Sequence, residues 1–488
     1  MKSTPREKIV DILTVIIVPL LIAAALIPAQ KFPLLLLLGL AVMASWIVSW
    51  FKLHYYLLAL IALFLPFSFE VPVSVNFSLL MPTEPLIAVA LLTMFWDIIY
   101  RPDLFKVLFE NETKWIMPLL ATYGITSIFS SLIMVSIKFS LLNISYILVF
   151  FIWQKYLFKN RPEVFPALLA LYSLSLTAVI LYAVYRYKQY EWNPVTIKGV
   201  FSPFFKDNTI FGASVAVIAA FWLVYSARVQ FRTGRLPGII AGLFFLAAVL
   251  FSNSRAAVLS IAFFGFMLIL LLLRVRIVHL AMGILIIAVM SVGFRDRLKD
   301  FLSGNTSMSH NPNSTYAEHI KSSGNITTDN SNIERLNRWL AGLAMFTEKP
   351  FTGFGPGTYQ FAYIPYQNPR FKSDLTVEDP WHIPENSGGT AHSEYILALS
   401  EMGILGLLAM LIFIARMAFI AFESAHNLKN RQLIIVSFCA LSTYFFHAFF
   451  NNFLNTDKFA FLVWGNAAWM FSNYEIIKYD RHRLLQRD

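Results

Sequence analysis

The sequence predicts an all-α, polytopic integral membrane protein with about 12–14 transmembrane helices and one large extracytoplasmic loop domain. Hydrophobic residues make up 57% of the 488 residues, charged residues only 14%, and the mean hydropathy is +0.62. These values lie far from those of soluble globular proteins. Apolar runs recur along most of the chain, and several reach the roughly 20 residues that cross a bilayer as a helix. Lys and Arg are also unevenly distributed between the loops, as in multi-pass proteins.

The apolar runs give about 14 candidate spans. Several are shorter than the roughly 17 residues that a span prefers, so we expect between about 12 and 14. The first run follows three basic residues, but it is too long for a signal peptide and a second run follows at once, so we expect a retained span. The runs are Ile9–Ala29, Pro33–Trp50, Tyr55–Phe67, Leu80–Ile99, Ile116–Ser136, Ser140–Trp153, Val164–Tyr185, Ile210–Val224, Leu236–Ser252, Ala256–Leu273, Val278–Val292, Glu394–Ile414, Leu433–Phe449 and Phe459–Phe471.

Charge bias predicts that both termini lie in the cytoplasm. When the spans alternate from a cytoplasmic N-terminus, the cytoplasmic loops and termini carry about 21 Lys and Arg, against about 8 in the short outside loops. Cytoplasmic loops are enriched in these residues, so this orientation is favoured over its reverse. The same bias accounts for the net charge of +11, which is therefore no sign of a nucleic-acid partner.

This topology divides the chain into three parts. Residues 1–292 form an N-terminal transmembrane bundle of about 11 spans, which includes an outside loop at 186–208. Residues 293–391 form the large extracytoplasmic loop. Residues 392–488 form the C-terminal spans and a cytoplasmic tail.

The extracytoplasmic loop contains one clear helix signal. Asn332 is a plausible N-cap, and the helix is expected to stop before Lys349-Pro350. A turn rich in Gly and Pro follows at 353–357, and then a strip of aromatic residues. We expect helix, turn and strip to form a cap on the outer membrane face. The apolar stripe that predicts the helix consists of Ile333, Leu336, Leu340, Leu343 and Phe346.

Three residues are candidates for catalysis because the topology puts them on the outer side of the membrane: Arg255, Arg335 and His392. Two arginines at a membrane boundary favour an anionic substrate, since a guanidinium binds phosphate in a bidentate manner. A histidine beside them suits proton transfer. Arg255 alone could also be an arginine that reaches from the span to lipid headgroups. Arg338 is a weaker third cation.

The span after His392 carries an acid and two small residues. Glu401 is expected deep in the span, where an acid needs a partner and is a functional candidate. At about 100° per residue, Gly403 and Gly406 fall within roughly 40° of the face of His392. We expect this stripe to let a lipid chain or another helix approach closely.

These motifs resemble those of the bacterial O-antigen ligase and polymerase superfamily. The resemblance is firm over about residues 200–408 and elsewhere depends on hydropathy alone. The stretches that carry it are Glu334–Trp339 with Lys349–Gly357, His392-Ser393 with Gly403–Gly406 and Glu401-Met402, Asn253–Arg255, and Gly199 with Asp207-Asn208.

The resemblance implies glycosyl transfer on the periplasmic face of the bacterial inner membrane. The donor would be a glycan on undecaprenyl diphosphate, and the acceptor lipid A-core, a second lipid-linked glycan or a protein side chain. Arg255 and Arg335 would stabilise the leaving diphosphate and His392 would be the base, so we expect an inverting, metal-independent enzyme without a cofactor. The residues expected to bind substrate are Arg338, Asp207, Asn208, Glu401, Gly403 and Gly406.

Other functions remain open at this point. A polymerase or a protein O-oligosaccharyltransferase would share the donor and the reaction. A transporter of the same lipid would show paired polar groups near the middle of the membrane and a repeat relating two halves. The sequence shows neither, because its polar residues gather at the outer face.

Overall fold

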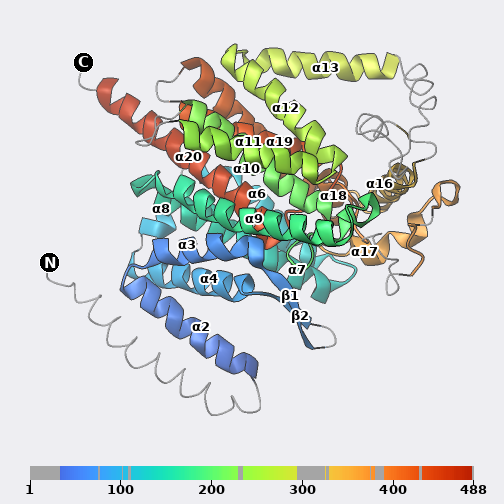
Figure 1. The fold of residues 1–488 in the computed structure, drawn as a ribbon, viewed down its shortest axis with the longest axis horizontal. Coiled ribbons are helices and arrows are strands. Elements are labelled where there is room, and N and C mark those ends of the chain that lie inside the picture. Colours follow the sequence, from blue (N-terminus) through green and yellow to red (C-terminus); the bar gives the residue numbers. More distant parts are fainter. Residues whose placement is uncertain are drawn as a thin grey trace.

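The computed structural model describes residues 33–74, 77–101, 103–107, 112–228, 235–293, 325, 329–373, 375–379, 389–427 and 431–485. These residues form a helical bundle, which confirms the all-α class (Figure 1). One element was not predicted, an antiparallel hairpin of β1 (Phe69–Ser74) and β2 (Phe77–Met81). The hairpin joins two spans. Its backbone hydrogen bonds pair N–H and C=O groups that a short loop would leave without partners.

The helices follow the predicted apolar runs closely. Each run from Pro33–Trp50 onward is mostly helical, whereas Ile9–Ala29 lies outside the described residues. The helices are α2 (Pro33–Trp50), α3 (His54–Phe64), α4 (Thr83–Tyr100), α5 (Asp103–Val107), α6 (Met117–Ile128), α7 (Ile133–Tyr146), α8 (Gln154–Asn160), α9 (Val164–Gln189), α10 (Asn208–Arg228), α11 (Leu236–Phe251), α12 (Arg255–Leu272), α13 (Ile277–Gly293), α16 (Asn330–Glu348), α17 (Tyr359–Ala362), α18 (Glu394–Asn427), α19 (Gln432–His447) and α20 (Asp457–Leu485). Shorter helical turns are η1 (Leu65–Phe67), η2 (Thr113–Trp115), the π-helix η3 (Ile147–Trp153), η4 (Pro194–Lys198), η6 (Ile364–Tyr366) and η7 (Pro369–Phe371).

Several of these helices are long and apolar enough to cross a membrane. Within the described ranges there are six, and four shorter apolar helices accompany them. The chain is therefore a multi-pass membrane protein. The total of 12–14 spans stays a prediction.

One predicted boundary between spans is wrong. The run Ile116–Ser136 was expected to be one span, but α6 ends at Ile128 and a new helix begins at Ile133. That helix continues through η3 to Asn160 without a turn at the predicted start of the next span. Hydropathy misses the turn because apolar residues flank it. Its backbone is held by Ser130, whose Oγ accepts from the Leu132 amide at 3.0 Å.

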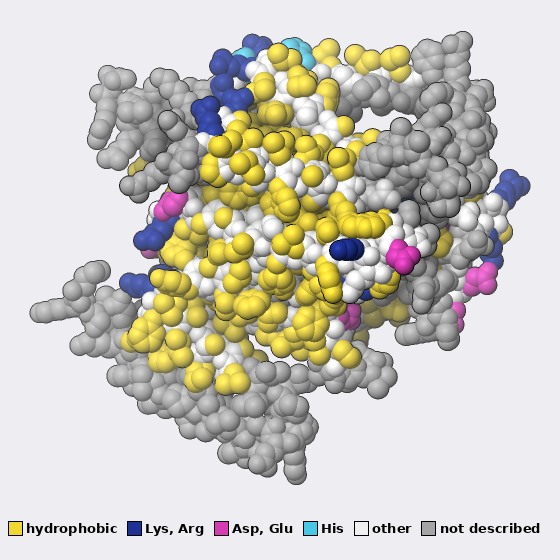
Figure 2. Space-filling model, viewed as in Figure 1, with side chains coloured by type: hydrophobic (Ala, Val, Ile, Leu, Met, Phe, Trp, Pro, Cys, Tyr) yellow, Lys and Arg dark blue, Asp and Glu magenta, His cyan; other side chains and the backbone are white. Residues whose placement is uncertain are grey.

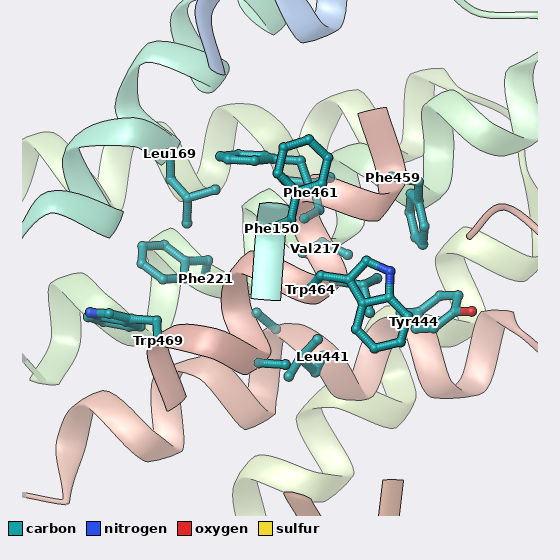
Figure 3. Packing of buried hydrophobic residues seen from close by; sticks show 14 of the residues in the cluster. Phe150, Leu169, Val217, Phe221, Leu441, Tyr444, Phe459, Phe461, Trp464 and Trp469 are labelled. Carbon is teal, nitrogen blue, oxygen red and sulfur yellow. The ribbon is translucent and has the colours of Figure 1, made fainter. Parts of the chain in front are cut away.

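The core of the bundle is aromatic (Figure 3). Phe461 of α20 meets the Phe150 ring of η3 with centroids 5.5 Å apart, and Trp469 meets Phe221 of α10 at 5.7 Å. In helix α10, 83% of the residues in its most apolar stretch are buried, as expected of a helix that is apolar on all sides. Association in a bilayer depends on such packing rather than on hydrophobic burial. Helices α10, η3 and α20 therefore form the rigid centre of the bundle.

Hydrogen bonds between connecting segments show which of them lie together at each end of the bundle. At one end, Ser68 donates to Asp457 at 3.0 Å and the Ser131 amide donates to the Phe354 carbonyl at 2.9 Å. Ser68, Asp457 and Phe354 lie in segments predicted to be outside, and Ser131 lies near the predicted outer end of the run Ile116–Ser136. Figure 2 shows hydrophobic side chains over most of the middle of the visible face, with most visible charges toward its two ends. The relative sidedness thus agrees with the predicted alternation, and its absolute direction stays a prediction from charge.

The opposite end is held by ion pairs. Arg416 of α18 donates two hydrogen bonds to Glu112, at 2.6 and 2.9 Å, and Lys155 donates to Glu475 at 2.8 Å. Nearby, buried Asp97 contacts the His54 ring at 3.0 Å and accepts from Ser49 and Trp153. The Asp97 carboxylate is thus fully engaged, and we assign this cluster to holding α2, α3, α4 and η3 together.

Candidate active site

Arg255 lies at the first position of α12, where a short turn brings the chain back into the bundle. Ser254 caps the helix by accepting from the Ala257 amide. The Arg255 side chain is only 11% exposed and points to the start of α16, where Nη1 lies 3.6 Å from Oδ2 of Asp329. Asp329 is itself the N-cap of α16, accepting from the Asn332 amide. Arg255 therefore joins a span to the extracytoplasmic helix.

Arg335 lies one turn further along α16 and meets Arg255 at a shared acceptor. The Oδ1 atom of Asn332 accepts from Nη2 of Arg255 and from Nη1 of Arg335, both at 3.4 Å. The structure therefore brings together the two arginines that the sequence singled out. Asn332 was predicted to be the N-cap, a position that Asp329 occupies instead.

The electrostatics of this cluster favour an anion. Burial is the largest cause that lowers the pKa of Arg335, to about 10, and the charge of Arg255 lowers it further, whereas Asp329 acts in the opposite direction. The pKa of Lys198, at the end of η4, is lowered by burial and then by both arginines. Three cations thus act on one another, which is costly unless negative charge joins them. The sequence reading missed Lys198, which no motif marks.

Asp207 lies just before α10 and Asn208 is its first residue, and both stabilise the backbone around the arginines. Asp207 Oδ1 accepts from the amides of Thr209 and Ile210, at 2.8 and 3.0 Å, so it caps the helix. Asn208 donates to the Ser252 carbonyl at 2.8 Å and thereby fixes the turn that carries Arg255. Both residues hold the site by these contacts, and their predicted part in substrate binding stays a prediction.

The Arg338 side chain stabilises the fold through buried hydrogen bonds. Its side chain is fully buried, with Nε donating to Glu334 at 2.7 Å and Nη1 donating to the Thr390 carbonyl at 3.0 Å. Glu334 also accepts from Thr376 at 2.8 Å. This buried pair ties two parts of the outer segment to α16, which is the use that its geometry supports best.

Helix α16 packs against the protein with the face opposite to its predicted apolar stripe. The predicted apolar stripe is only partly buried, and Leu343 is 41% exposed. The buried face consists instead of polar and small residues, Glu334, Asn337, Arg338, Ala341, Gly342 and Met345. Gly342 is needed there, because a Cβ would lie 2.5 Å from the Ile396 side chain of α18. The apolar stripe is thus left on the outside, as in helices that lie in a membrane interface.

His392 lies where α16, α18 and the end of α19 meet. It precedes α18 in a left-handed conformation, with φ of 49°, and its carbonyl accepts from Nε1 of Trp339 at 3.3 Å. Trp339 is one turn beyond Arg335 on α16. On the other side, the Glu394 amide donates to the Ala448 carbonyl at 2.9 Å. The backbone of His392 is therefore held at Trp339, one turn from Arg335 on α16.

The expected glycine stripe is wrong, because α18 is broken at Gly403. This residue has φ 64° and ψ −161°, so positions before and after it do not share one helical phase. Its Cα faces the glycine turn, where a Cβ would lie 2.3 Å from the Phe351 carbonyl oxygen. A Cβ on Gly406 would lie 2.3 Å from the Met402 Cβ. Gly403 therefore admits the turn, whereas the stripe was expected to admit a lipid or a second helix.

The glycine turn replaces the hydrogen bonds that the break removes. In an unbroken helix the Ile404 amide would donate to the Ser400 carbonyl. Here Ile404 donates to Pro350 at 2.8 Å, and Ser400 accepts from Phe354 at 3.0 Å. Irregular backbone at this depth is tolerated only when protein satisfies it in this way.

We call the contact between the glycine turn and the break at Gly403 the latch. Glu401 adds three hydrogen bonds to this latch. Its two carboxylate oxygens accept from the amides of Gly357 and Tyr359, at 2.8 and 2.9 Å, and its carbonyl accepts from Gly355 at 2.8 Å. The acid that the sequence marked as functional thus has backbone partners. We assign it to positioning the outer segment, and substrate contact stays a prediction.

An apolar cavity lies next to the site, inside the bundle. Its walls come from α6, α7, α18, α19 and α20, and its few polar members include Glu394, two residues beyond His392. Most of the lining is aliphatic or aromatic. Such a wall suits a hydrocarbon chain rather than a sugar.

Comparison with known proteins gives one family match. Residues 240–411 match a family model described as O-Antigen ligase. The matched range contains Arg255, Arg335, His392 and the break at Gly403, whereas Lys198, Asp207 and Asn208 lie before it. A search among curated proteins finds no match.

Proposed function

We propose that this chain, which the ligase match at residues 240–411 assigns to the O-antigen ligase superfamily, is a membrane glycosyltransferase of the ligase type. It moves a glycan from an undecaprenyl-diphosphate-linked donor to lipid A-core or a similar acceptor. The reaction takes place on the periplasmic face of the bacterial inner membrane. The observation that carries the proposal is the pair Arg255 and Arg335 at the shared Asn332 oxygen.

The chemistry of the donor explains why cations are needed. The leaving group is a diphosphate, which departs as an anion and needs no proton. Guanidinium groups placed where its charge develops lower the barrier, since such preorganised charge is worth most in a site that excludes water. Arg255 and Arg335 carry this role, and Lys198 adds to the field that attracts the donor.

His392 is proposed to activate the acceptor. A sugar hydroxyl is a weak nucleophile until a base takes its proton, and imidazole is the side chain best suited near neutral pH. Attack in line with the leaving diphosphate would invert the anomeric carbon. The apolar cavity beside Glu394 would accept the prenyl chain, so that lipid and diphosphate bind on either side of His392.

The acceptor is tested by product analysis. Purified protein in proteoliposomes is incubated with labelled lipid-linked glycan, with and without lipid A-core. A ligase transfers the label to the core only when core is present. Label that appears in longer lipid-linked glycans without core would instead identify a polymerase, and intact donor under both conditions would refute the proposal.

A further inference from the structure

A second histidine lies in the same neighbourhood and was not singled out from the sequence. His447 ends α19 and is 1% exposed. Its Nδ1 lies 3.4 Å from the amide nitrogen of Asn451, and its ring packs on Phe453 with centroids 5.5 Å apart. Its other nitrogen, Nε2, is buried and has no hydrogen-bond partner in the part of the chain that the structure describes. Such an atom calls for an explanation, because buried polar atoms are nearly always paired.

The same condition recurs on Arg335. Its Nε atom is also buried without a hydrogen-bond partner among the described residues. The charge of Arg335 acts on the His447 imidazole, although the two residues come from α16 and α19. Trp339 connects both residues to the site. Its ring centroid lies 6.4 Å from that of Phe450, three residues after His447, and its Nε1 donates to the His392 carbonyl.

The partner of Nδ1 indicates what Nε2 does. We assign the side-chain amide nitrogen of Asn451 as the donor in this contact, which makes Nδ1 the acceptor and places the ring proton on Nε2. Nε2 of His447 and Nε of Arg335 are then two buried N–H donors. Donors without partners beside a cation suit an anionic oxygen.

We propose that His447 contacts the substrate directly, with its Nε2 donating a hydrogen bond to an oxygen of the donor diphosphate alongside Nε of Arg335. This inference depends on the proposed function, in that the anion is taken to be a prenyl diphosphate. It gives the two histidines different tasks. His392 takes a proton from the acceptor, and His447 holds the leaving group.

The test compares two variants of equal length. In His447→Gln the amide nitrogen can reach the place of Nε2 and still donate, whereas His447→Met has a similar shape and no N–H. The probe is undecaprenyl diphosphate itself, titrated into purified protein in detergent. We expect the Met variant to bind about tenfold more weakly or worse, and the Gln variant to stay within a few-fold of the wild type, since hydrogen bonds to charged groups are the strong ones.

The control is His426→Met, the same change at an exposed histidine near the end of α18, which should bind like the wild type. If His447→Met does not accumulate, His447→Phe replaces it, because a ring fills the space beside Phe453 without a donor. Equal affinity in the wild type and in the Met or Phe variant would overturn the inference, as would equal losses in the Gln and Met variants. Failure of the wild type to bind undecaprenyl diphosphate would instead count against the proposed function.

Discussion

Arg255 and Arg335 donate to one atom, the amide oxygen of Asn332, and each does so at 3.4 Å. Two guanidinium groups at one neutral acceptor repel each other, and the nearest carboxylate, Asp329, lies 3.6 Å from Arg255. A bound diphosphate would offset that repulsion. The relationship therefore supports a site that is electrostatically complete only with its substrate.

The guanidinium geometry is expected to matter as much as its charge. Arg255→Lys and Arg335→Lys keep the charge but lose the bidentate fork. Each should weaken binding of undecaprenyl diphosphate by about tenfold to 150-fold, equivalent to about 1.5–3 kcal/mol. Arg276→Lys, at an exposed position beyond the other end of α12, is the matched control and should bind normally. Wild-type affinity in both site variants would favour arginines that only reach lipid headgroups.

Asn332→Asp tests whether the pair is an anion site. The new carboxylate would bind both guanidinium groups and offset part of their positive charge. It would therefore compete with the donor diphosphate for them. We expect affinity for undecaprenyl diphosphate to fall by at least about tenfold, more than the charge change alone produces. Asn330→Asp adds the same charge at an exposed position of the same helix and serves as the comparison. Equal affinities in the two variants would show that the cluster does not bind the anion.

Binding should weaken as pH rises. The pKa values of Lys198 and Arg335 are lowered, the latter to about 10, so both lose positive charge at a lower pH in the folded protein than in the unfolded chain. Their mutual repulsion therefore opposes folding at neutral pH and is relieved as pH rises through those values. The terminal phosphate is already ionised above about pH 6. Thermal unfolding between pH 8 and 10 should show a shrinking stabilisation by undecaprenyl diphosphate, and a constant or growing one would contradict the proposed cluster.

His392 is expected to act as a base and not as a binding group. Transfer should fall as pH drops below roughly 6.5, where an ordinary imidazole takes up a proton. His392→Gln should lose turnover and keep its affinity for the donor, because Gln can hydrogen-bond but takes no proton. The pH profile and the donor titration are measured on the same preparations, with His426→Gln alongside. Normal turnover in His392→Gln would reduce the residue to orienting the acceptor.

The helix break should tolerate no side chain. Gly403→Ala puts a Cβ against the Phe351 carbonyl in a backbone conformation that is essentially restricted to glycine. We expect a loss of at least about 1–3 kcal/mol and detachment of the glycine turn, seen as a lower unfolding temperature. Gly265→Ala in α12 is the control, since a Cβ there meets nothing within 4 Å and Ala is the better helix former. An equal unfolding temperature for the two variants would contradict the latch.

The sequence predicts the helices well, and it predicts that the three candidate residues lie at one end of the bundle, because both depend on local patterns. Apolar runs mark the spans, and their alternation brings Arg255, Arg335 and His392 to one end. What it misses depends on tertiary contacts. Hydropathy does not register the left-handed backbone of Gly403, so the break in α18 was read as a continuous stripe.

The apolar stripe of α16 was predicted, whereas the side of this helix that faces the protein was not. An apolar stripe predicts the buried face only when the surroundings are water, whereas this helix turns polar partners such as Arg338 to the protein. Lys198 and His447 stand in no motif. Only the packed structure shows that both act electrostatically with Arg335.

We propose that the Arg255–Arg335 pair holds the diphosphate that leaves during transfer. This role is tested by the initial rate at which undecaprenyl diphosphate is released from labelled lipid-linked glycan, with lipid A-core present, in wild type and Arg335→Lys. We expect the wild type to release undecaprenyl diphosphate in step with glycan transfer, and the variant to release it at a rate at least about tenfold lower. Release at the same rate by both proteins would contradict it.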